Sequence, residues 1–130
     1  MRNGELTGAS LVGADLSDAN LENASLRYVN LTGARLRGAD LRGAHLDGAN
    51  CTGARLEGAD LRGAHLYLAN FTGAHLLGAN LSDANGSTDS SDGTDFTAAN
   101  FHLADLAGAN LEGAILNGTK MPDGVVHGSL

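Results

Sequence analysis

The chain has 130 residues, a formal net charge of −7, 19 glycines, one cysteine and only five aromatic side chains (three Phe and two Tyr). The length suits a single domain, 1–130, and the scarcity of large aromatics argues against a conventional two-layer core. The sequence has no long apolar run, which argues against a membrane span or a signal peptide. The single cysteine excludes an internal disulfide. The net negative charge argues against direct binding of nucleic acid. We therefore expect a cytoplasmic protein.

A repeat of five residues begins close to the N-terminus. A large apolar residue, here called position i, recurs every five residues from Leu6 to Leu81, with Ala usual at i−2 and Gly frequent at i+2. A period of five fits neither a plain helix nor a plain strand, but i−2 and i alternate with polar neighbours as in a short strand. The pair that follows, rich in Gly, predicts a turn. Each quintet is thus a three-residue strand and a corner.

Four quintets make one coil of twenty residues. Segments 34–53 and 54–73 follow one another and agree at 16 of 20 positions, as two coils stacked in register would. We expect coils to pair at about 4.8 Å, which makes the chain a solenoid stabilised by contacts between neighbouring coils. The predicted core columns in and next to this region are Leu36, Leu41, Leu46, Cys51, Leu56, Leu61, Leu66, Phe71 and Phe101.

The quintets ADLRG, ANLEG, ARLRG and ANFTG resemble the signature of the pentapeptide-repeat family, A(D/N)LXX. The resemblance covers roughly residues 4–85 and 95–121. It implies an all-β fold, a right-handed quadrilateral parallel β-helix of about five coils. Many proteins with very different roles carry this repeat, so the resemblance predicts the fold far more than the function.

The phase fails once, at NGSTDSSDGT, residues 85–94. We interpret these ten residues as an excursion loop inserted into one quintet. Phe101 should then stack on Phe71. The same register predicts one ladder of asparagines, Asn30, Asn50, Asn70 and Asn100. The alternative, two degenerate quintets, would place the two Phe side chains on different faces.

The repeats end near Pro122, which cannot donate to a backbone ladder, and we expect a short tail at 122–130. The tail is too short, and lacks the pattern, for a capping helix. Uncovered coil ends are sheet edges, so the chain is expected to be a monomer or an end-to-end homodimer.

Metal binding has two weak candidates. The segment 89–95 holds three carboxylates, Asp89, Asp92 and Asp95, but their spacing does not match a Ca²⁺-binding EF-hand, and a solvated acidic loop is the favoured interpretation. His45 should stack on His65, but no third or fourth ligand follows at a recognisable spacing. We expect no metal and no cofactor.

Residues twenty apart should form columns on the outer faces, and these columns are the candidate interaction surface. One column holds Arg35, Arg55 and His75. A second has Asp40 and Asp60 beside Arg42 and Arg62, and such exposed pairs contribute about 0–1 kcal/mol each. The chain has no nucleophile elbow, P-loop or H-E-x-x-H motif, and a filled rod offers no cleft, so we expect no enzyme.

Two functions remain. The first is a structural or protein-interaction module with an unidentified protein partner. The second is a DNA mimic that binds a type II topoisomerase such as DNA gyrase and modulates quinolone sensitivity, as some members of the family do. Duplex DNA carries one negative charge per ~1.7 Å, whereas residues 27–62 have six Arg against four acidic residues, a net +2. The loop at 85–94 favours the interpretation as a DNA mimic, whereas the net positive charge of residues 27–62 argues against it. The chain could also be a domain of a larger protein.

Overall fold

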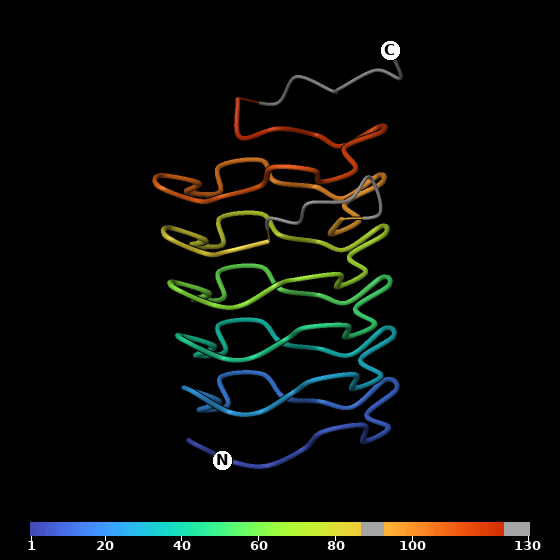
Figure 1. Cartoon of the computed structure of the whole chain (residues 1–130), viewed down its shortest axis with the longest axis vertical. Coiled ribbons are helices and arrows are strands. Elements are labelled where there is room, and N and C mark those ends of the chain that lie inside the picture. The colour runs from blue at the N-terminus through green and yellow to red at the C-terminus, as the bar shows by residue number, and fades with distance from the viewer. Residues whose placement is uncertain (87–92, 124–130) are drawn as a thin grey trace.

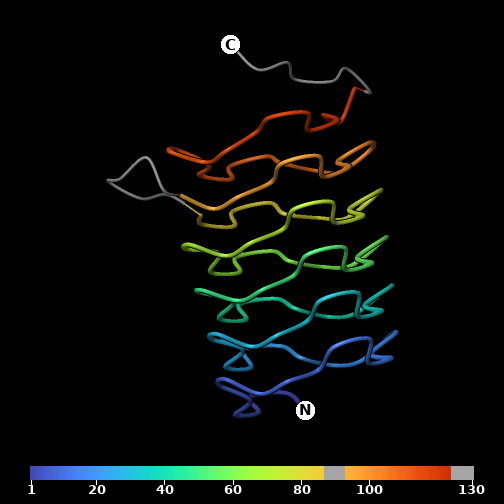
Figure 2. The ribbon, with the colours of Figure 1, turned by 90° about the vertical axis from the view of Figure 1, so that its right-hand side faces the viewer.

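The computed structural model describes residues 1–86 and 93–123. The chain winds into coils that stack along the long axis of the molecule, with the N-terminus at one end and the last described residues at the other (Figure 1). A view turned by 90° shows the same stack (Figure 2). In the described residues, coils pair through single residues rather than extended strands. No helix in this part of the chain is long and apolar enough to cross a membrane.

Four parallel ladders, one on each side of the coil, join the outward residues at i−1. The His ladder consists of Glu5, Ser25, His45, His65, Asn85 and Asn110. The Asn ladder consists of Ser10, Asn30, Asn50, Asn70, Asp95 and Ile115. The Arg ladder consists of Asp15, Arg35, Arg55, His75, Asn100 and Lys120. The Asp ladder consists of Asn20, Asp40, Asp60, Asn80 and Asp105. The right-handed sense of the coil stays a prediction.

Backbone hydrogen bonds set this register. In each regular quintet the amides at i−1, i and i+2 bond to neighbouring coils, and the amide of the next Ala closes the turn by bonding to the carbonyl at i. The quintet around Leu36 has Arg35 N to Ala14 O at 2.8 Å, Leu36 N to Arg55 O at 2.7 Å, Gly38 N to Glu57 O at 3.1 Å and Ala39 N to Leu36 O at 3.0 Å. Position i+2 has a positive φ, such as 66° at Gly38, which explains the frequent Gly.

The core is made of the inward columns. All nine predicted core residues are buried, and the alanines at i−2 pack between them. Cys51 is one of these core residues, and burial raises the pKa of its thiol to about 12. It therefore packs as a small apolar side chain.

The predicted register across the break is wrong. Asn70 pairs with Asp95 instead of Asn100, so the register advances by 25 residues where 20 is normal, and five residues are extra rather than ten. Phe71 stacks on Phe96, with ring centroids 5.2 Å apart. Phe101 instead continues the column of Leu76, whose amide bonds to Asn100 O, and it contacts Phe96 at 4.9 Å.

An irregular quintet at Asn85 and Gly86 explains the error. Asn85 lies in the His ladder, so it belongs to a coil and not to a loop. Gly86 takes the position usually held by Leu, and a Cβ there would lie 2.8 Å from Thr94 Oγ1. The buried Thr94 hydroxyl donates to Leu66 O at 2.6 Å and lies 3.0 Å from Gly86 O. Thr94 thus takes the place of an inward Ala and closes the interrupted coil.

The regular pattern continues to Pro122. Its carbonyl accepts a hydrogen bond from Leu103 N at 3.0 Å. The residue at i+1 contributes only its carbonyl to the bonds between coils, so proline is tolerated at this corner. The predicted start of the tail at residue 122 is therefore wrong, because Pro122 still belongs to a regular corner. Residues 124–130 lie outside the described part.

Replacing Leu61 with Asp should abolish the folded protein, because Leu61 is 0% exposed in the middle of a core column and an unpaired carboxylate there is very costly. Leu77→Asp is the matched control, since Leu77 is 41% exposed at a corner. Circular dichroism and the soluble yield measure both variants. A folded Leu61→Asp protein would contradict the inward assignment of position i.

Candidate interaction surface

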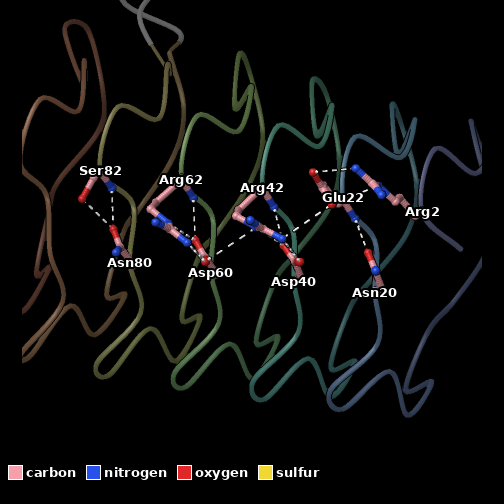
Figure 3. Close-up of polar contacts among 9 residues, drawn as sticks. All are labelled: Arg2, Asn20, Glu22, Asp40, Arg42, Asp60, Arg62, Asn80 and Ser82. Atoms are coloured by element: carbon pink, nitrogen blue, oxygen red, sulfur yellow. Dashed lines mark hydrogen bonds and ion pairs between the residues drawn. The ribbon is translucent and has the colours of Figure 1, made fainter.

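The structure places the candidate interaction residues on two neighbouring ladders. Arg35, Arg55 and His75 follow one another in the Arg ladder, and Asp40 and Asp60 do so in the Asp ladder. Arg42 and Arg62 lie at the corner after the Asp ladder, beside these carboxylates (Figure 3). The role of either ladder in binding stays a prediction.

The Asp ladder is paired within the molecule. Arg42 contacts Asp40 at 2.6 Å and Glu22 at 3.5 Å, and Arg62 contacts Asp60 at 2.7 Å (Figure 3). Hydrogen bonds from these guanidinium groups hold the pKa of each aspartate below its usual value. Each of these charges thus has an opposite charge as its partner within the molecule.

The Arg ladder differs from the Asp ladder because its two arginines form no ion pair with a carboxylate among the described residues. Arg35, Arg55 and His75 are all exposed. In the described part of the chain, neither arginine lies within 4.0 Å of a carboxylate. The arginines that do have a carboxylate partner are Arg2, Arg27, Arg37, Arg42 and Arg62. The two unpaired arginines are therefore adjacent on one flat face.

Two leucines near this ladder were missed by the sequence analysis. Leu77 and Leu103 lie at the corner after the Arg ladder and are 41% and 68% exposed. Their signal in the sequence is a large apolar residue at i+1 or i+2, where Gly or a polar residue is usual.

The two stacked histidines form a separate cluster on the His ladder. The rings of His45 and His65 are 4.4 Å apart and nearly parallel, at 10°. Arg27 Nη2 lies 3.0 Å from His45 Nδ1, and Asp47 lies 3.9 Å from the same nitrogen. Burial, His65 and Arg27 lower the pKa of His45. Among residues 1–86 and 93–123, no three His, Cys, Asp or Glu side chains are placed to hold a metal ion.

The acidic segment at 89–95 is only partly described. Asp89 and Asp92 lie outside the described residues. Asp95 belongs to the Asn ladder, and its carboxylate accepts hydrogen bonds from the amide of Thr97 at 2.8 Å and from its hydroxyl at 2.6 Å. Asp95 therefore closes a corner, as Asn does in the coils below it.

Known proteins share this repeat and architecture. The sequence model of the family described as Pentapeptide repeats matches eight copies, over residues 5–43, 24–63, 49–85 and 92–121. A pentapeptide repeat protein (Rfr23) from the cyanobacterium Cyanothece 51142 is 29% identical, with a TM-score of 0.62 over 94% of this chain and 90% of that chain. The pentapeptide repeat protein alr5209 from Nostoc Pcc 7120 is 34% identical, with a TM-score of 0.64 over 82% of this chain and 83% of that chain.

Other likenesses are weaker. QnrB1, a plasmid-mediated fluoroquinolone resistance protein, is 21% identical with a TM-score of 0.48, over 92% of this chain and 73% of that chain. No curated protein sequence matches the chain.

His45 should make the stability of the protein depend on pH. Its pKa is lowered on folding from about 6.5, so its contribution is fully present above pH 6.5 and is lost as the pH falls from there through the folded-state pKa. The free energy of unfolding by urea, measured from pH 8 to pH 5, should therefore decrease, and His45→Asn should reduce this decrease. Equal slopes for wild type and His45→Asn would contradict the assignment.

Proposed function

Because this chain belongs to the pentapeptide-repeat family, we propose that it is a non-enzymatic protein-interaction module. It acts as a rigid rod whose outer ladders are presented to a protein partner. Proteins built from this repeat are generally structural or interaction modules. Fold alone does not decide function, so the proposal depends on what the surface of this chain offers.

The observation that supports it best is the fixed order of outward side chains on the flat faces. The backbone hydrogen bonds hold each coil to its neighbours, so one outward-facing residue per side and coil is held about 4.8 Å from the next. The interior is filled by the Leu, Phe and Ala columns. A partner therefore meets a pre-organised surface, and little conformational entropy is lost when the rod binds.

A DNA mimic is the second candidate, and the distribution of charge does not favour it. A mimic needs negative potential along the rod, but residues 27–62 have a net charge of +2 and include the unpaired Arg35 and Arg55. Positive charge in the middle coils would repel a surface that binds the phosphates of duplex DNA.

The proposal predicts that the immobilised folded chain retains a specific protein from a bacterial lysate in near-stoichiometric amount. The unfolded Leu61→Asp variant on a second column is the control for non-specific capture. Retention of no protein above this control would contradict the proposed function.

A supercoiling assay separates the two candidates. We expect DNA gyrase activity and its quinolone sensitivity to be unchanged at micromolar protein. Inhibition or protection of gyrase would favour the mimic, and a variant with residues 87–92 deleted would show whether that segment is needed.

A further inference from the structure

The corners of this coil usually need a side chain to complete their hydrogen bonds. The amide at i+1 has no backbone acceptor, and an Asn or Asp at i−1 accepts it instead. Asn30 Oδ1 accepts from Thr32 N at 3.1 Å, and Asp60 Oδ1 accepts from Arg62 N at 3.2 Å. This is the Asx-turn, and it gives a physical reason for Asn and Asp in the repeat.

Three successive residues of the Arg ladder, Arg35, Arg55 and His75, lack these acceptors, whereas Asp15 and Asn100 of the same ladder provide them. Arginine has only donors, so Arg35 and Arg55 cannot close their corners, and His75 makes no such bond in the structure. Three successive backbone N–H groups therefore have no acceptor among the described residues. They belong to Arg37, Glu57 and Leu77.

The unpaired charge lies beside these free amides. Arg35 and Arg55 are exposed and adjacent in the ladder, where like charges destabilise each other. The nearby carboxylates do not neutralise both of them. Asp15 accepts a hydrogen bond from Ser17 and, of the two arginines, interacts electrostatically with Arg35, while Glu57 contacts Arg37 at 3.4 Å. The face thus offers guanidinium groups and free backbone N–H groups together, which are the donors that bind carboxylates most strongly.

Two exposed leucines lie at the corners after the Arg ladder, toward the C-terminal end. Leu77 lies in the same quintet as His75, and Leu103 lies at the same corner one coil further on. Both are exposed, at 41% and 68%. The phosphate groups of a nucleic acid would gain nothing from contact with these leucines, whereas an apolar side chain of a protein segment would bury them.

We propose that the Arg ladder and the corner after it bind an acidic segment of a partner protein. Its Asp or Glu carboxylates pair with Arg35 and Arg55 and accept the free amides, in the place that the Asn and Asp oxygens occupy on other faces. An apolar residue of the same segment packs over Leu77 and Leu103. This inference rests on the proposed interaction function and names the chemistry of the partner.

Nucleic acid fits the same surface less well. The chain has a net charge of −7, and the Arg ladder holds two unpaired arginines, far fewer than the 6–10 phosphate contacts typical of a DNA-binding protein. Acidic residues on the other ladders would repel a long polyanion.

A labelled peptide tests the proposal directly. The probe is a ten-residue peptide with Asp at three alternate positions followed by Leu-Leu, and its binding is measured by fluorescence anisotropy at low salt. Arg35→Gln/Arg55→Gln should weaken binding by about tenfold or more, the scale of one lost charge-assisted contact. Arg42→Gln/Arg62→Gln removes the same charge from the paired ladder and should leave binding within about twofold of wild type.

The leucine variants and the results below test the remaining parts of the proposed binding site. Leu77→Ser/Leu103→Ser should weaken the peptide that ends in Leu-Leu but not one that ends in Ser-Ser. Equal loss in both arginine variants, no binding at millimolar peptide, or tighter binding of a labelled DNA oligonucleotide would each overturn the proposal. A lysate partner retained equally by wild type and Arg35→Gln/Arg55→Gln would leave the proposed function standing and overturn only this site.

Discussion

The backbone hydrogen bonds between successive coils are the constraint on which the whole structure depends. Each regular quintet uses three amides to bond neighbouring coils and a fourth to close its turn. In the regular coils this pattern stacks the large apolar residue of one quintet on that of the next coil and Ala on Ala, and Gly86 and Thr94 at the break are the exceptions. The hydrophobic columns are therefore a consequence of the ladder as well as its stabiliser. A solenoid of this kind is stabilised by neighbours in sequence, with no central core shared by distant segments.

The corners of the coil are the places where these backbone hydrogen bonds bear on the proposed binding surface. At each corner the amide at i+1 has no backbone acceptor, and the side chain at i−1 determines whether this amide is hydrogen-bonded within the molecule. Asn and Asp satisfy it, as at Asn30 and Asp60, and the resulting faces are closed. Where Arg or His stands at i−1, the same backbone geometry presents a free donor next to a cationic or imidazole side chain. A single substitution at i−1 can thus open or close a corner without any change of fold, and our proposal assigns binding to the open corners of the Arg ladder.

Much of this could be predicted from the sequence, because a strict period leaves few alternatives. The core columns follow from the spacing of five, and the four-sided coil and the neighbours in the Arg and Asp ladders follow once the twenty-residue repeat of 34–53 and 54–73 is added. The register across the break did not, because Gly86 and Thr94 take places where the repeat has Leu and Ala, and their mutual fit is a tertiary contact. Ala84-Asn85 and Thr94-Asp95-Phe96 were the signal, since both begin like a quintet. The free amides could not be inferred before the Asx bonds of the other corners were known.

Disulfide cross-linking across the break tests the ladder register most directly. Ladder neighbours have Cα atoms about 4.8 Å apart, within the range that a disulfide needs. Asn70→Cys/Asp95→Cys should form an internal disulfide on mild oxidation and raise the stability of the protein, and the native Cys51 is buried and will not compete. Asn70→Cys/Asn100→Cys should stay reduced, because these residues lie on different sides of the coil. Efficient cross-linking of the second pair and not of the first would contradict the register, and with it the account of how this coil is held together.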